Sequence, residues 1–127
     1  MKPSHREKVR RRHVVCREDE LPPGSMKLVP IGKFGVGVFN VNGTYRGLTN
    51  YCPHEGGPLC AGNVRGTTET CPDSPAGLRW IREGEIVRCP WHQWEFDIAT
   101  GETLAVPKRG IRTYTVEVVD GMVSLVL

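Results

Sequence analysis

Long apolar runs are missing from this chain. None of its 127 residues belongs to a stretch of the ~20 apolar residues that a membrane-crossing helix needs, and the N-terminus lacks the apolar core of an export signal. No long segment repeats apolar residues at the helical period either, which argues against a helical fold. We therefore expect a single domain that does not enter a membrane and that remains in the cytoplasm.

Positive charge is concentrated at one end of the chain. The first 17 residues hold seven of the 17 basic groups and one acidic group, so residues 18–127 carry ten basic and thirteen acidic groups. Such a tail could contact nucleic acid or an acidic partner, but no aromatic residues interleave its charges and no nucleic-acid-binding motif follows. We expect residues 1–12 to form a flexible basic tail and no nucleic acid to be bound.

The remaining residues, 13–127, have the pattern of an all-β domain. Glycine and proline are frequent, with 15 and 10 residues, and they separate short runs of strand-forming residues. Asn42-Gly43 and Asp120-Gly121 are signals for tight hairpin turns. We predict antiparallel strands at residues 13–17, 26–31, 34–41, 44–49, 78–81, 86–88, 94–97, 111–119 and 122–127.

Two short motifs, Cys52-Pro53-His54 and Cys89-Pro90-Trp91-His92, combine a thiolate with an imidazole. Each lies in a predicted loop, over residues 51–62 and 88–97, and the prolines restrict these loops. The two loops together supply two sulfur and two nitrogen ligands to one metal site. Zinc would accept this set, but small zinc modules usually pair Cys with Cys and His with His.

The residues around these motifs resemble a known family. Cys52-Pro53-His54-Glu55-Gly56-Gly57-Pro58-Leu59 and Arg88-Cys89-Pro90-Trp91-His92-Gln93-Trp94-Glu95-Phe96-Asp97 resemble the two cluster-binding loops of Rieske ferredoxins and Rieske domains. The resemblance implies a Rieske-like antiparallel β-sandwich with a two-loop subdomain that binds one [2Fe–2S] cluster. It implies that Cys52 and Cys89 hold the inner iron, and that His54 and His92 hold the outer, more exposed iron.

The same resemblance indicates a low reduction potential. High-potential Rieske proteins of respiratory chains place a Ser and a Tyr, which donate hydrogen bonds to the cluster, at the positions of Trp94 and Phe96, and a disulfide-forming Cys at the position of Trp91. Phe96 has no donor. We expect a potential near the bottom of the Rieske range of about −150 to +300 mV.

Neighbouring residues of the first loop have two interpretations. Gly56 and Gly57 either bring backbone amides close to the cluster sulfurs or form a plain turn. Pro58 and Leu59 are expected to form an apolar lid over the site.

One feature departs from the family pattern. His54 and Cys89 are separated by 34 residues, whereas the family usually has roughly half as many. We predict that residues 66–77 form an inserted polar surface loop. Cys16, Cys60 and Cys71 lie outside the ligand set; a Cys60–Cys71 disulfide is conceivable, but free thiols are favoured in the cytoplasm.

The family resemblance implies an electron carrier and not an enzyme. Its partners would be a flavin-dependent NAD(P)H reductase, which donates electrons, and a terminal oxygenase, which receives them. No mononuclear iron site of the 2-His-1-carboxylate type is recognisable. The alternatives are a Rieske-like small subunit of a nitrite-reductase-type enzyme and a zinc-stabilised or redox-sensing binding module.

Overall fold

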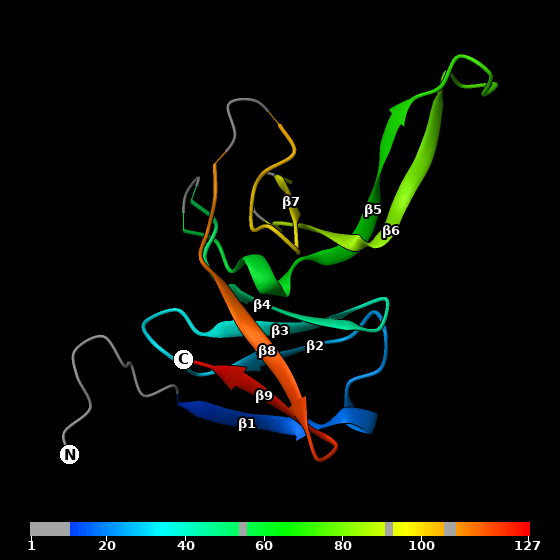
Figure 1. Cartoon of the computed structure of the whole chain (residues 1–127). Coiled ribbons are helices and arrows are strands. Elements are labelled where there is room, and N and C mark those ends of the chain that lie inside the picture. Colours follow the sequence, from blue (N-terminus) through cyan, green and yellow to red (C-terminus); the bar gives the residue numbers. More distant parts are fainter. Residues whose placement is uncertain (1–10, 54–55, 91–92, 106–108) are drawn as a thin grey trace, which may run out of the picture.

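The computed structural model describes residues 11–53, 56–90, 93–105 and 109–127. These residues form nine strands in two antiparallel sheets, together with two short 3₁₀ helices (Figure 1). The elements are β1 Arg12–Arg17, η1 Glu18–Glu20, β2 Met26–Val29, β3 Val36–Val41, β4 Thr44–Thr49, η2 Leu59–Ala61, β5 Asn63–Thr70, β6 Leu78–Arg88, β7 Glu95–Asp97, β8 Thr113–Val119 and β9 Met122–Val126. The all-β antiparallel prediction is confirmed.

The larger sheet has six strands in the order β1-β9-β8-β4-β3-β2. Two of its hairpins close through the predicted turns: Asn42 and Gly43 have φ angles of 51° and 97°, and Asp120 and Gly121 have φ angles of 51° and 76°. Positive φ at both central positions is the requirement of a type I′ turn. The first strand begins at Arg12, so the predicted tail ends one residue earlier, and residues 1–10 lie outside the described ranges.

Strand β3 supplies side chains to two buried apolar clusters because successive residues of a strand point to opposite faces. Val36 and Val38 belong to a cluster with Val123 and Leu125 of β9. Phe39 points the other way, into a cluster that lies between the two sheets. This second cluster contains Cys52 and Cys89, so the larger sheet is the base on which the two predicted metal-binding loops rest.

The smaller sheet has the order β5-β6-β7 and corrects the expectation for residues 66–77. Residues 66–70 are part of β5, which pairs with β6, and only residues 71–77 form the connecting turn. The prediction failed because the segment has no apolar alternation. Its strand is stabilised by threonines, which favour the β-conformation, and by the cross-strand ion pair of Glu69 with Arg79.

Strand β6 is also longer than predicted, since it replaces two expected strands with one. Arg82 and Gly84 have positive φ angles, and the pairing with β5 shifts between Arg65 and Thr67. This irregularity bends the ribbon without ending it. Beyond it, β5 and β6 project away from the other strands as a separate two-stranded ribbon (Figure 1). Within the described residues, no helix is long and apolar enough to cross a bilayer.

Candidate metal centre

The first metal-binding loop follows β4 and is closed by two backbone hydrogen bonds. The Cys52 amide donates to the Gly57 carbonyl at 2.8 Å, and the Gly56 amide donates to the Cys52 carbonyl at 2.7 Å. Gly56 has a φ of 75°, a conformation that side-chain-bearing residues rarely adopt. The Gly56 amide was predicted either to face the cluster sulfurs or to belong to a plain turn. The structure shows the turn, because this amide donates its hydrogen bond to the Cys52 carbonyl within the loop.

The second loop connects β6 to β7 and is shorter than the predicted range of 88–97. Arg88 still belongs to β6 and Glu95 already belongs to β7. The Cys89 amide donates to the Trp94 carbonyl at 2.8 Å, and Gln93 has a φ of 61°. Because two paired strands hold its ends, this loop has little freedom to move Cys89.

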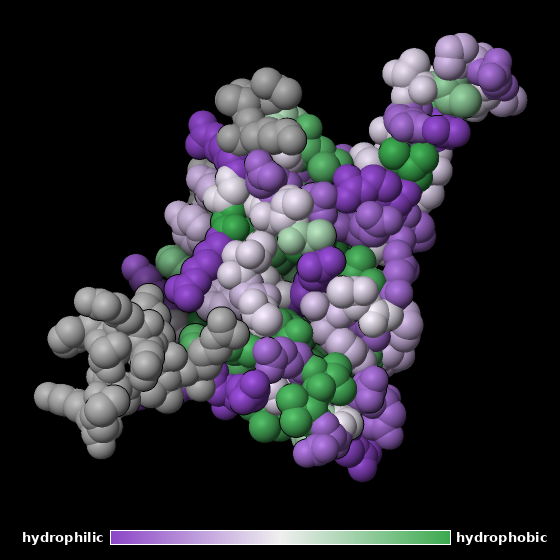
Figure 2. Space-filling model, in the orientation of Figure 1, coloured by the Kyte–Doolittle hydropathy of each residue, from purple (hydrophilic) through white to green (hydrophobic). Residues whose placement is uncertain are grey.

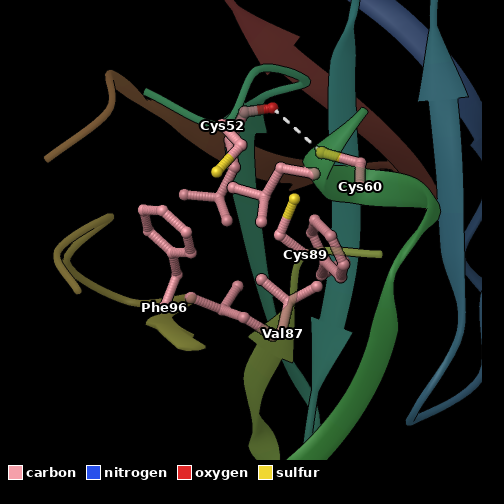
Figure 3. Packing of buried hydrophobic residues seen from close by; sticks show 9 residues of the cluster. Cys52, Cys60, Val87, Cys89 and Phe96 are labelled. Atoms are coloured by element: carbon pink, nitrogen blue, oxygen red, sulfur yellow. Dashed lines mark hydrogen bonds between the residues drawn. The ribbon is translucent and has the colours of Figure 1, made fainter. Parts of the chain in front are cut away.

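The two loops bring Cys52 and Cys89 into one apolar environment. Cys52 is 1% exposed and Cys89 is fully buried. In Figure 3 their sulfur atoms point into the same interior space, bordered by Cys60 and the Phe96 ring. Neither cysteine forms a disulfide. The cluster that surrounds them consists of Phe39, Leu48, Leu59, Cys60, Val87, Phe96 and Ile98.

The other two predicted ligands, His54 and His92, lie outside the described residues. Over the described ranges, no group of three or more His, Cys, Asp and Glu residues is arranged so that it could hold a metal ion. The structure therefore brings together the two predicted sulfur ligands and describes neither nitrogen ligand.

The two buried thiols suit the sulfur-bound end of an iron–sulfur cluster. A thiolate without a counter-charge is costly in apolar surroundings, whereas a thiolate bound to iron shares its charge with the metal. Two such groups facing one space, on loops held by backbone hydrogen bonds, form a preorganised pair of ligands. The donor set therefore fits the iron that two cysteines bind in a Rieske centre.

Cys60 is a third buried sulfur in the same cluster, and nothing in its sequence context assigns it this position. Its Sγ donates to the Leu48 carbonyl at 3.6 Å, and its amide donates to Asn50 Oδ1 at 2.8 Å. Burial raises the pKa of the Cys60 thiol to about 12, so it stays neutral at physiological pH. Cys71 lies in the ribbon turn, and both cysteines are free, so the Cys60–Cys71 disulfide is not formed.

The neighbouring aromatic and apolar residues complete the surroundings of the thiols. Phe96 is fully buried and offers no hydrogen-bond donor, and Trp94 packs against the cluster from its edge. Leu59 is also fully buried and belongs to the core cluster around the thiols. Cys16 is buried in β1, as expected. Trp91 lies outside the described residues.

Two loops that carry the predicted ligand motifs lie on an antiparallel β-scaffold, and each holds a buried cysteine, which is the arrangement expected of a small iron–sulfur β-domain. The sequence model of the family described as "Rieske [2Fe-2S] domain" matches residues 11–115. The chain belongs to this family, and its cofactor is one Rieske-type [2Fe–2S] cluster.

Known proteins of several kinds are similar to this chain. Apoptosis-inducing factor 3 of Homo sapiens is 34% identical over 88 residues, which are 69% of this chain and 12% of that protein. The ferredoxin component of the naphthalene 1,2-dioxygenase/salicylate 5-hydroxylase systems of Ralstonia sp is 26% identical over 108 residues, 84% of this chain and 86% of that protein. The solved structure of Sphingomonas yanoikuyae B1 ferredoxin has a TM-score of 0.65 and 26% identity, covering 91% of this chain and 97% of that one. The chain thus spans a small part of the first relative and most of the other two.

Proposed function

We propose that this protein is a one-electron carrier in which Cys52 and Cys89 bind one iron of the cluster and His54 and His92 bind the other. The observation that carries the proposal is that Cys52 and Cys89 are buried in a single apolar cluster and are not joined in a disulfide. Each histidine belongs to the same short motif as one of these cysteines. When bound, the cluster accepts and releases a single electron.

The surroundings of the two thiols support a carrier of low potential. Water is kept from the sulfur ligands because both cysteines are at most 1% exposed. Neutral imidazole ligands raise the potential above that of all-cysteine clusters, and donors to the sulfurs would raise it further. Phe96 supplies no donor, and the Gly56 amide is used within its loop. These features favour the lower part of the Rieske range.

The proposed partners are a flavin-dependent NAD(P)H reductase and a terminal oxygenase, and the proposed location is the cytoplasm. The similarity to the ferredoxin component of a dioxygenase system supports the partners, because the match covers most of both chains. None of the five cysteines forms a disulfide, which is the state that a reducing compartment maintains. On this proposal the chain transfers electrons and catalyses no reaction of its own.

Anaerobic purification followed by metal analysis and EPR spectroscopy tests the cofactor assignment. We expect two irons and two acid-labile sulfides per chain and a rhombic spectrum after reduction, with an average g value below that of all-cysteine clusters. A colourless protein that contains one zinc would overturn the proposal and support a zinc module.

The partners require a separate assay, because the spectrum does not distinguish a ferredoxin from a nitrite-reductase-type subunit. Reduction by a flavoprotein reductase encoded near this gene, followed by substrate turnover in a neighbouring oxygenase, is the expected result. Electron delivery only to a nitrite reductase would replace the proposed partners and leave the carrier function intact.

A further inference from the structure

A cavity of about 490 Å³ lies beside the second metal-binding loop. Its described lining comes from the end of β6, the start of β7, residues 103–105 and Arg109. Gln93, which directly follows the proposed ligand His92, is part of this lining. The lining also includes Arg88, Trp94, Glu95, Leu104 and Arg109.

Arg88 lines this cavity and has one buried nitrogen without a hydrogen-bond partner. Its Nη2 lies 3.2 Å from Glu95 Oε2, but its Nε atom is buried and has no hydrogen-bond partner among the described residues. A buried donor without an acceptor is unfavourable. The Arg88 side chain as a whole is 29% exposed, so an acceptor that enters the cavity would meet its accessible atoms and not the buried Nε.

The only carboxylate of the described lining is already engaged. Glu95 Oε2 lies within ion-pair distance of Arg88 and 3.7 Å from Arg65 Nε, while Glu95 Oε1 accepts a hydrogen bond from Thr67 Oγ1 at 3.0 Å. Two guanidinium groups therefore share one carboxylate. This arrangement leaves positive charge at the cavity wall.

Arg109 adds a further positive charge to the cavity lining. Its guanidinium carbon lies 5.7 Å from the centre of the Trp94 ring, and it forms no ion pair with a described residue. Its backbone is held by two hydrogen bonds to Thr103, which include the Arg109 amide to Thr103 Oγ1 at 2.9 Å. This local positive charge contrasts with residues 18–127 as a whole, which carry ten basic and thirteen acidic groups.

We propose that the cavity is the docking site for a carboxylate side chain of an acidic partner protein that exchanges electrons with this chain. The inference rests on the proposed function, because the partner must approach the second loop to receive an electron. Guanidinium groups form two parallel hydrogen bonds to a carboxylate. The apolar surfaces of Trp94 and Leu104 reduce the access of water and so strengthen the attraction.

Oxidation of the reduced holoprotein by two small complexes of opposite charge tests the inference. The anionic probe, iron(III)–EDTA, carries carboxylates, and the cationic probe is hexaammineruthenium(III). In each reaction one electron leaves the protein and reduces the probe metal from the +3 to the +2 state, and no bond forms. Stopped-flow absorption at low ionic strength gives the second-order rate constants.

The informative variants are Arg109→Gln and Arg88→Gln, and the control is Arg112→Gln. Arg112 also stacks on an aromatic ring, at 4.5 Å from the centre of Tyr114, and its loss changes the net charge equally, but it is not part of the cavity lining. We expect Arg109→Gln to slow oxidation by iron(III)–EDTA about threefold, the effect of one charge at about 6 Å in water. The cationic probe should react faster, and added salt should remove both effects.

Other outcomes would overturn the docking site, its proposed occupant or the carrier function. An equal effect of Arg112→Gln would assign the response to overall charge and overturn the docking site. Saturation kinetics with iron(III)–EDTA, or inhibition by citrate that depends on Arg109, would indicate a site for a free small anion and overturn the proposed occupant. If both probes react normally in all variants, the inference fails while the carrier function stands. A protein without a reducible cluster would overturn both.

Discussion

The side chain of Cys60 occupies the space that the absent side chain of Gly37 leaves on β3. A Cβ atom at Gly37 would lie 2.7 Å from Cys60 Cβ, closer still to Cys60 Sγ, and 3.0 Å from the Phe39 ring. Together with the hydrogen bonds of Cys60 to Asn50 and Leu48, this fit attaches the end of the first metal-binding loop to the larger sheet. Cys52 is thereby held above that sheet, where it meets Cys89.

The first prediction concerns this fit. Gly37→Ala should lower the free energy of unfolding by about 2 kcal/mol, because an added methyl group in a packed core forces its neighbours to move. Denaturant unfolding of the reduced apoprotein measures the change. The control is Gly110→Ala, where the nearest atom would be 3.8 Å from the new Cβ and the change should stay within about 0.5 kcal/mol. Equal stability of the two variants would contradict the close contact.

The second prediction separates the three cysteines of the buried cluster. Cys52→Ala and Cys89→Ala should abolish the Rieske EPR signal, because each removes a ligand, whereas Cys60→Ala should retain it. All three cysteines are at most 1% exposed, so the comparison is matched for burial. Iron content and EPR spectra of the three variants give the result. Loss of the signal in Cys60→Ala with an intact fold by circular dichroism would show that the ligands are wrongly assigned.

The third prediction tests the assignment of His92 as a nitrogen ligand, with the variant His92→Cys. We expect it to lose the Rieske signal, because a third thiolate changes both the charge and the ligand field of the outer iron. EPR spectroscopy of the reduced protein gives the readout, with Cys71→Ser as a control at the distant ribbon turn. An unchanged spectrum of the His92→Cys variant would contradict the role of His92.

The fourth prediction concerns the reduction potential. Phe96→Tyr adds a hydroxyl group in a fully buried position beside the thiols, and a hydrogen bond to a sulfur would stabilise the more negative, reduced state. We expect the midpoint potential to rise by about 40 mV, the equivalent of one hydrogen bond of about 1 kcal/mol for a one-electron couple. Redox titration monitored by EPR measures the shift. Phe96→Leu, which adds no donor, should leave the potential unchanged; an equal rise in both variants would point to altered packing instead.

The fifth prediction concerns the β5–β6 ribbon. Thr67 and Ile81 face each other across the ribbon, so residues 68–80 can be replaced by Asn-Gly, which closes a two-residue hairpin. Iron content and EPR signal should be retained, and the melting temperature should change by less than about 5 °C. The reason is that the distal ribbon is paired only with itself and leaves Leu78 and Trp80 about half exposed, at 48% and 49%. Figure 2 shows it as a separate projection of the surface. Loss of iron would show that the ribbon supports the metal centre.

Local features of the sequence were sufficient to predict much of the fold. The two hairpins with Asn42-Gly43 and Asp120-Gly121 could be predicted because positive φ angles restrict the residues that fit there. Strand β5 could not, because threonine and charged residues form it and no apolar alternation marks it, and β6 was predicted only as two short strands, at residues 78–81 and 86–88. Its stability depends on pairing across the ribbon, which no single segment reveals.

The metal centre, like the fold, could be predicted from the sequence only in part. The sequence by itself determined which residues form the two mixed Cys/His motifs and that each motif lies in a loop, since spacing and proline content are local properties. Only the tertiary structure decided that Cys52 and Cys89 share one apolar cluster, that Cys60 stands beside them against Gly37, and that Arg88 and Arg109 face the same cavity. The physical reason is that these residues meet through strand pairing and packing between segments far apart in the chain, and such contacts depend on the whole fold.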